Sequence, residues 1–158
     1  MAGIYMLYDG IDGAVTTSGF EKWIEILQLK WGFERDTNKA MDGSTSWGRP
    51  PSVHEVTVTK RSDKATTLLI QKGLSNEPAS TVKFKFTATA KDKVATYLAV
   101  ELSDCLISSF NMHGAEGVPE ETLKVNFTKI MFTFTPRDAG LIGSPTSTTY
   151  DLKKATTS

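Results

Sequence analysis

Hydrophobic and polar residues alternate with a period of two along much of this chain, which is typical of half-buried β-strands. The segment "STVKFKFTATA" at 80–90 is the clearest case, with one apolar face made of Val82, Phe84, Phe86 and Ala88. Further strands are predicted over "VHEVTVTK" at 53–60 and over the very long segment "VATYLAVELSDCLISSFNM" at 94–112. The residues "KDK" at 91–93 fit a hairpin turn between two of these strands. The pattern therefore predicts a mainly β protein.

One segment, "EKWIEILQLKWGFER", changes its phase midway. Ile24 and Ile26 lie on one phase, and the opposite phase carries four residues that we expect to fill the core: Leu27, Leu29, Trp31 and Phe33. A reversal of phase is what a β-bulge or a change of sheet produces, so we predict a strand over about 20–33 with a bend near Ile26–Leu27. A helix is the alternative, because Trp23, Leu27 and Trp31 are spaced by four residues. That helix face would also carry Lys30 and Glu34, which favours the strand.

The segment "TLKVNFTKIMFTFTP" repeats this behaviour near the other end of the chain. Its apolar phase changes after Phe127, and we predict a second bend near Thr128–Lys129. Long bent strands and several hairpins indicate a curved two-sheet β-barrel.

A single helix is predicted in "SDKATTLLIQKGLSN", where the period of two is lost. Leu68, Leu69 and Lys72 fit one short helix that ends near Gly73, with Asp63 or Thr66 as its N-cap. We expect this helix to lie against the flank of the barrel.

A long loop is predicted over about 34–52, rich in Gly, Ser, Thr, Asp, Asn and Pro. It is longer than most connections within a compact domain, and such loops are often functional. It carries Met41 and Trp47, and Arg49 precedes the stiff pair Pro50-Pro51. We therefore expect Met41, Trp47 and Arg49 to contact neighbouring molecules.

Composition limits the possible functions of the chain. The 158 residues suit a single domain spanning 1–158, with 137–158 as its C-terminal segment. Lys and Arg number 18, as do Asp and Glu, so no net field attracts nucleic acid or an anionic membrane. No apolar run is long enough for a membrane span, and the N-terminus lacks the features of a Sec signal peptide. A lone cysteine, Cys105, excludes an intramolecular disulfide framework.

The sequence offers no arrangement for catalysis. "GSTSWG" at 43–48 has the wrong spacing for a nucleophile elbow, and no phosphate-binding glycine motif is present. His54, His113 and Cys105 lack the spacing of metal ligands, so we expect neither a metal nor a cofactor. Asp104 lies beside Cys105 in an apolar strand, and we expect it to be hydrogen-bonded or to face a subunit interface. These observations predict a binding or assembly module and not an enzyme.

Several segments, in this order, resemble one known family. They are "WIEILQLKWGF", "VTVTKRSDKATTLLIQKG", "ELSDCLISSFNM", "ETLKVNFTKIMFTFTP" and the terminal "YDLKKAT". Together they resemble haemolysin-coregulated protein (Hcp), the tube subunit of the bacterial type VI secretion system. The chain departs from the family pattern at Thr66-Thr67, where a proline usually follows Ser or Thr, and at Thr149-Tyr150, where Gly-Trp is frequent.

The resemblance implies a fold like that of phage tail-tube proteins, and six subunits that form a ring. Stacked rings make a hollow tube, a contractile sheath propels the tube with a spike at its tip, and effectors travel in the lumen. Such a protein resides in the bacterial cytoplasm before firing and is then secreted or delivered into a target cell. A wet lumen needs a polar wall, so we expect Gln28 and Lys30, on the polar phase of the bent strand, to face it. The rival interpretation is a carbohydrate- or protein-binding β-sandwich that uses Trp47 as a platform.

Overall fold

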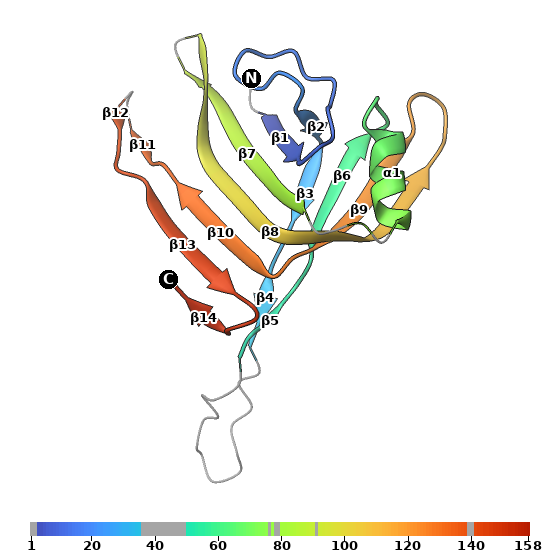
Figure 1. Ribbon diagram of the computed structural model, residues 1–158. Helices are drawn as coiled ribbons and strands as arrows, with labels where there is room; N and C mark the ends of the chain where they lie inside the picture. Colours follow the sequence, from blue (N-terminus) through green and yellow to red (C-terminus); the bar gives the residue numbers. More distant parts are fainter. Residues whose placement is uncertain (1–2, 36–49, 76, 78–79, 91, 139–140) are drawn as a thin grey trace.

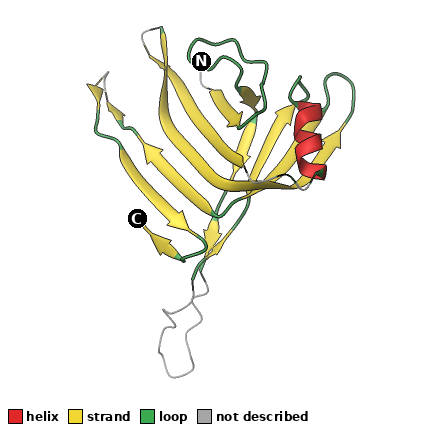
Figure 2. Cartoon of the chain, in the orientation of Figure 1, coloured by secondary structure: helices red, strands yellow, loops and turns green. Residues whose placement is uncertain are grey.

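The computed structural model describes residues 3–35, 50–75, 77, 80–90, 92–138 and 141–158. These residues form one helix, α1 (Thr66–Leu74), and fourteen strands (Figures 1 and 2). The strands are β1 (Gly3–Tyr8), β2 (Ile24–Ile26), β3 (Gln28–Lys30), β4 (Phe33–Glu34), β5 (Ser52–Val53), β6 (Val56–Arg61), β7 (Ser80–Ala90), β8 (Lys93–His113), β9 (Glu120–Asn126), β10 (Lys129–Phe134), β11 (Arg137–Asp138), β12 (Leu141–Ile142), β13 (Thr146–Asp151) and β14 (Thr156–Thr157). The mainly β fold with one short helix is thereby confirmed.

The strand pairings, together with the chain connection between β2 and β3, form a closed circuit. A first sheet has the order β14-β13-β10-β8-β7-β1-β2, and a second run of pairings joins β3, β6, β9 and the far half of β8. Only Leu27 separates β2 from β3, so the circuit closes through the bent segment. All pairs along it are antiparallel, and two short ribbons, β4–β5 and β11–β12, lie outside it.

Both predicted bends are changes of sheet. At the first, β2 pairs with β1 while β3 pairs with β6, and the Leu27 N–H donates to the Thr59 carbonyl at 2.8 Å. At the second, β9 pairs with β6 and β10 pairs with β13, with Phe127 and Thr128 between the two strands. The structure therefore has strands, and no helix, in the segment "EKWIEILQLKWGFER", as the phase change predicted.

The 21-residue strand β8 spans both sheets because its backbone turns at Asp104. Residues before this point pair with β7 and β10, and residues from Leu106 onward pair with β9. Asp104 has φ 53°, a left-handed conformation that aspartate tolerates better than most residues.

The core lies between the two runs of strands, and α1 closes one side of it (Figure 2). The helix contributes Leu69, which is fully buried, and it contacts β8. The N-cap position belongs to Ala65, without a side-chain cap, so the expectation of Asp63 or Thr66 there is wrong. Asp63 and Thr66 instead stabilise the turn that leads into the helix. In this turn, Asp63 Oδ1 accepts a hydrogen bond from the Ala65 N–H at 3.0 Å. The Asp63 N–H in turn donates to Thr66 Oγ1 at 2.9 Å.

Candidate functional site

The residues expected as core anchors in the bent segment divide into two groups. Leu29 and Trp31 are half-buried and pack against the core. Leu27 is 40% exposed and Phe33 is 61% exposed, so their assignment to the core is wrong. Leu27 is exposed because it stands at the change of sheet, and Phe33 because β4 extends beyond the barrel in a two-stranded ribbon (Figure 1).

Gln28 and Lys30, the expected lumen residues, are exposed on a polar sheet face. The strand register aligns Gln28 with Thr59 of β6, and Thr59 with Thr122 of β9. Lys30 is aligned in the same way with Thr57 and Lys124. Because aligned residues of neighbouring strands point to the same side, these positions form a continuous polar face opposite the core.

An open depression of about 430 Å³ lies at one end of this polar face. Lys30 and Lys124 line it together with His54 and Glu55. His54 Nε2 lies 3.6 Å from Glu34 Oε1, and both side chains are more than half exposed. Charges of both signs in an open, wet depression suit transient contacts better than a tight small-molecule site.

A buried polar network, which the sequence did not reveal, joins β6, β9 and the start of α1. The side chains of Lys60 and Glu121 are both fully buried, and Lys60 Nζ lies 3.0 Å from Glu121 Oε1. Lys60 Nζ also donates to Asp63 Oδ1 at 2.9 Å. Thr66 Oγ1 donates to the second Glu121 oxygen at 2.6 Å. The network therefore fixes the helix to two strands, with its charges paired.

The sequence does carry a signal for this network. Lys60 follows Val56 and Val58 on the inward phase of β6, and Glu121 precedes Leu123 and Val125 on the inward phase of β9. A charged residue on the apolar phase of a strand is buried with a partner when the phase is maintained. Two such residues of opposite charge on two strands indicate a buried ion pair.

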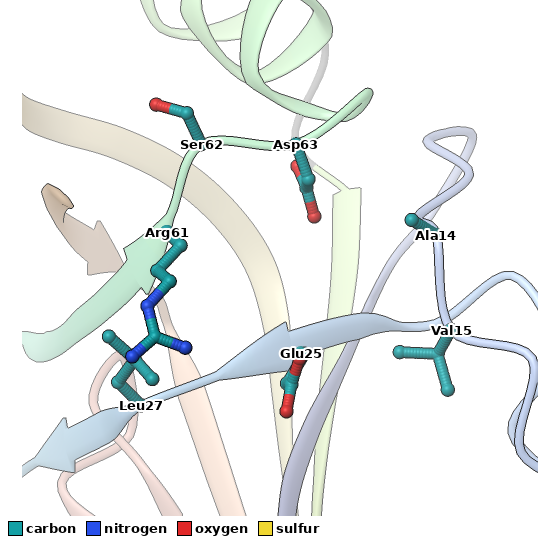
Figure 3. Close-up of a pocket in the computed structure, with 7 residues that line it drawn as sticks. All are labelled: Ala14, Val15, Glu25, Leu27, Arg61, Ser62 and Asp63. Carbon is teal, nitrogen blue, oxygen red and sulfur yellow. The ribbon is translucent and has the colours of Figure 1, made fainter. Parts of the chain in front are cut away.

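Beside this network lies a small pocket of about 160 Å³ (Figure 3). Arg61, Ser62 and Asp63 line it from the end of β6, and Glu25 and Leu27 line it from the bent segment. The Ser62 hydroxyl is buried and has no hydrogen-bond partner among the described residues. The Ser62 hydroxyl is not hydrogen-bonded to Asp63 or Glu25, which also line the pocket, so the described residues give it no base that would activate it as a nucleophile.

Cys105 and Asp104 do not form a catalytic pair. Burial raises the pKa of the Cys105 thiol to about 12, and the nearby Asp104 carboxylate adds to this shift. The thiol therefore stays protonated at neutral pH and is a poor nucleophile. Asp104 accepts a hydrogen bond from Thr128 Oγ1 at 2.7 Å, so the expectation of a hydrogen-bonded Asp104 is confirmed.

Met41, Trp47 and Arg49 lie outside the described residues. Within the part of the chain that is described, no cluster of His, Cys, Asp and Glu could hold a metal ion. No helix in that same part is long and apolar enough to cross a membrane.

The fold and these surfaces define a class of protein, namely a mainly β barrel with one flanking helix and an extended polar sheet face. Comparison with known families agrees, because the profile described as "Type VI secretion system effector, Hcp" matches residues 5–134. The chain belongs to this Hcp family of non-enzymatic tube proteins of the type VI secretion system, which assemble as hexamers. No curated protein sequence matches it.

Solved structures share the fold. A structure described as that of a type six secretion system protein has a TM-score of 0.92 and 21% identity, over 100% of both chains. Hcp1 from Salmonella typhimurium has a TM-score of 0.78 and 18% identity, over 97% of this chain and 96% of its own. A type VI secretion system effector from Yersinia pestis gives 0.75 and 21%, over 94% and 98%. At these identities the likeness concerns the fold.

Proposed function

We propose that this chain forms rings of six that stack into a hollow tube, which a sheath propels together with a spike. The observation that carries the proposal is the family match over residues 5–134. The closed circuit of strands supports it, because a closed barrel leaves few free sheet edges and suits repeated side-by-side association.

The polar face that carries Gln28 and Lys30 forms the wall of the lumen in this proposal. It is supported by the register, which places threonines and Lys124 beside these two residues and no large apolar side chain among them. A wall of this kind stays hydrated, so effectors are held by weak polar contacts and released after delivery.

The long loop over about 34–52 contacts neighbouring subunits or stacked rings in this proposal. Met41 and Trp47 would supply the apolar contacts, and Arg49 the polar one. The support comes from the sequence, because a loop that served only as a connection would not need these side chains.

The proposal also implies where the protein folds and how it leaves the cell. It folds in the bacterial cytoplasm, where a free thiol such as that of Cys105 stays reduced, and leaves when the sheath contracts. Partners are then other copies of the chain, the spike and sheath proteins, and the effectors that it carries.

Negative-stain electron microscopy of the purified chain tests this function. Hollow rings of six subunits, and the protein in the culture medium of cells with a functional secretion apparatus, are the expected results. A chain that stays monomeric at micromolar concentration and is retained by such cells would contradict the proposal.

A further inference from the structure

The buried contact between Lys60 and Glu121 places an amine against a carboxyl group. The two residues lie directly opposite each other in the antiparallel pair of β6 and β9, where opposite Cβ atoms are about 4.5–5.5 Å apart. Lys60 Nζ lies 3.0 Å from Glu121 Oε1, and neither side chain is exposed. Reacting atoms that are held about 3–3.5 Å apart need little further movement to form a bond.

We propose that Lys60 and Glu121 condense to an amide, which links β6 to β9 covalently through their side chains. The Lys60 nitrogen bonds to the carboxyl carbon of Glu121, one C–O bond of that carboxyl group breaks, and the oxygen leaves as water. The ammonium and the carboxylate together contain all the atoms of one amide and one water, so the step needs no co-reactant. The newly folded chain carries the ion pair, and the amide accumulates with time.

Burial favours this condensation, which is unfavourable between free ions in water. Water stabilises the ionised groups, and a fully buried ion pair has lost that solvation. The amide is neutral, so the reaction removes two buried charges. The fold also holds the two groups against each other, and well-oriented intramolecular reactions reach effective concentrations of about 10⁵–10⁸ M.

Asp63 is placed to carry protons in this step. Lys60 Nζ donates a hydrogen bond to Asp63 Oδ1 at 2.9 Å. The nitrogen must lose protons as it attacks and the leaving oxygen must gain them, so a carboxylate in contact with the amine suits both transfers. The Asp63 side chain is 19% exposed and lines the pocket of about 160 Å³ in Figure 3, which offers space for the released water.

The hydrogen bonds of the ion pair also suit the amide. Thr66 Oγ1 donates to Glu121 Oε2 at 2.6 Å, and this oxygen becomes the amide carbonyl. The amide N–H keeps Asp63 as its acceptor. Asp63 itself remains a carboxylate, because it is partly exposed and already accepts a hydrogen bond from the Ala65 N–H. Reaction at Glu121, and not at Asp63, is therefore the one that removes a fully buried carboxylate.

Mass spectrometry of the full chain tests the proposal. The folded protein is kept at neutral pH for a week, and its intact mass is compared with that of a freshly purified sample. We expect a growing fraction that is lighter by one water molecule, and a branched peptide containing Lys60 and Glu121 after proteolysis. The branched peptide is the deciding result, because an Asp-Gly sequence such as Asp12-Gly13 can also lose water by cyclisation.

Two variants complete the experiment. The double variant Lys60→Met/Glu121→Leu lacks both reacting groups and keeps every Asp-Gly sequence, so it should give no branched peptide. Asp63→Asn keeps an acceptor for the Ala65 N–H but carries no proton, and it should slow the cross-link at least about tenfold. A cross-link that forms equally fast in this variant would overturn the role of Asp63.

The wild-type chain decides the proposal without depending on how the variants fold. A week-old sample without the branched peptide would overturn the inference. A branched peptide that joins Lys60 to Asp63 would overturn it as well, because the reacting carboxyl group would then be the wrong one. Neither result bears on the proposed ring.

Discussion

At the scale of single residues, the charged cluster around Lys60 is sensitive to the loss of any one of its members. Its ammonium group is fully buried and lies within 3.0 Å of carboxylate oxygens from Asp63 and Glu121. A buried ion pair adds little net stability when it is compared with an apolar pair, but removal of one partner leaves a buried charge uncompensated. The cluster therefore specifies how α1 docks more than it adds stability.

We expect Lys60→Met to lower the free energy of unfolding by about 3–5 kcal/mol, because among the described residues Glu121 then keeps only the Thr66 hydroxyl as a partner. Urea unfolding followed by circular dichroism, at a concentration where rings are dissociated, measures this loss. Lys124→Met, at an exposed position of β9, is the control and should change stability by less than about 0.5 kcal/mol. The double variant Lys60→Met/Glu121→Leu should recover much of the loss. No recovery would show that packing, and not charge, dominates at this site.

Two buried groups make stability fall in alkaline solution. The pKa of Cys105 is raised from 9.0 to about 12, and that of Tyr8 from 10.0 to about 12, in both cases chiefly by burial. The folded chain therefore keeps these protons at a pH where the unfolded chain has lost them. The stability that they contribute is fully present below pH 9.0 and is lost as the pH rises towards about 12.

The melting temperature should thus decline above pH 9.0, and less steeply for Cys105→Ala than for the wild-type chain. The native thiol should also react slowly with a thiol reagent at neutral pH and rapidly once urea unfolds the chain. Fast labelling of the native protein would contradict a buried, protonated Cys105.

At the scale of elements, the chain makes its barrel from strands that change partners midway. The bent segment does so at Leu27, β9 and β10 do so at Phe127–Thr128, and β8 does so at Asp104. Each change allows one continuous stretch of sequence to serve two sheets, which closes the circuit without long connections.

The turn in β8 can be tested by comparing two substitutions of Asp104. Both Asp104→Gly and Asp104→Ala lose the hydrogen bond to Thr128, so the difference between them isolates the backbone. At φ 53° glycine is unstrained and alanine is not, so the alanine variant should be less stable by about 1 kcal/mol. Equal denaturation midpoints for the two variants would show that β8 adapts its backbone at no cost.

At the scale of the whole molecule, the polar face and the long loop carry the proposed functions in the tube. Lys30→Glu reverses one charge on the polar face without altering the core. We expect unchanged folding and rings, and altered retention of a lumenal effector in co-purification. Lys83→Glu, at an exposed position of the other sheet, is the control. If both variants retain an effector equally, the polar face does not line the lumen.

Deletion of residues 38–46, with a short Gly-Ser link in their place, tests the loop. The barrel should stay folded because no described strand is touched, whereas stacking of rings into tubes should fail. Electron microscopy of the purified variant distinguishes single rings from tubes. Tubes of normal length, together with normal secretion, would show that the loop has no part in assembly.

The sequence by itself determined the longer strands, the helix and two of the three bends, whereas the turn of β8 at Asp104 and the short strands near the C-terminus were not predicted. Alternation of apolar and polar residues predicts strands because neighbouring side chains of a strand point to opposite faces. A reversal of phase, as between Ile26 and Leu27, predicts a bend for the same reason. The loss of this period in "SDKATTLLIQKGLSN" correctly predicted the helix, which the structure places at Thr66–Leu74, and the order of segments from the bent strand to "YDLKKAT" indicated the family.

Only the tertiary structure decided which faces are covered. Leu27 and Phe33 share the apolar phase of Leu29 and Trp31, yet they are exposed. Burial depends on which other elements of the fold pack against a residue, and the phase of its strand does not specify this. The partnership of Lys60 with Glu121 joins residues 61 positions apart, and an apolar groove at Trp31 joins the β4–β5 ribbon to strands near the C-terminus. Periodicity describes which residues share one face of one strand, whereas contacts between distant strands follow from the register and closure of the whole barrel.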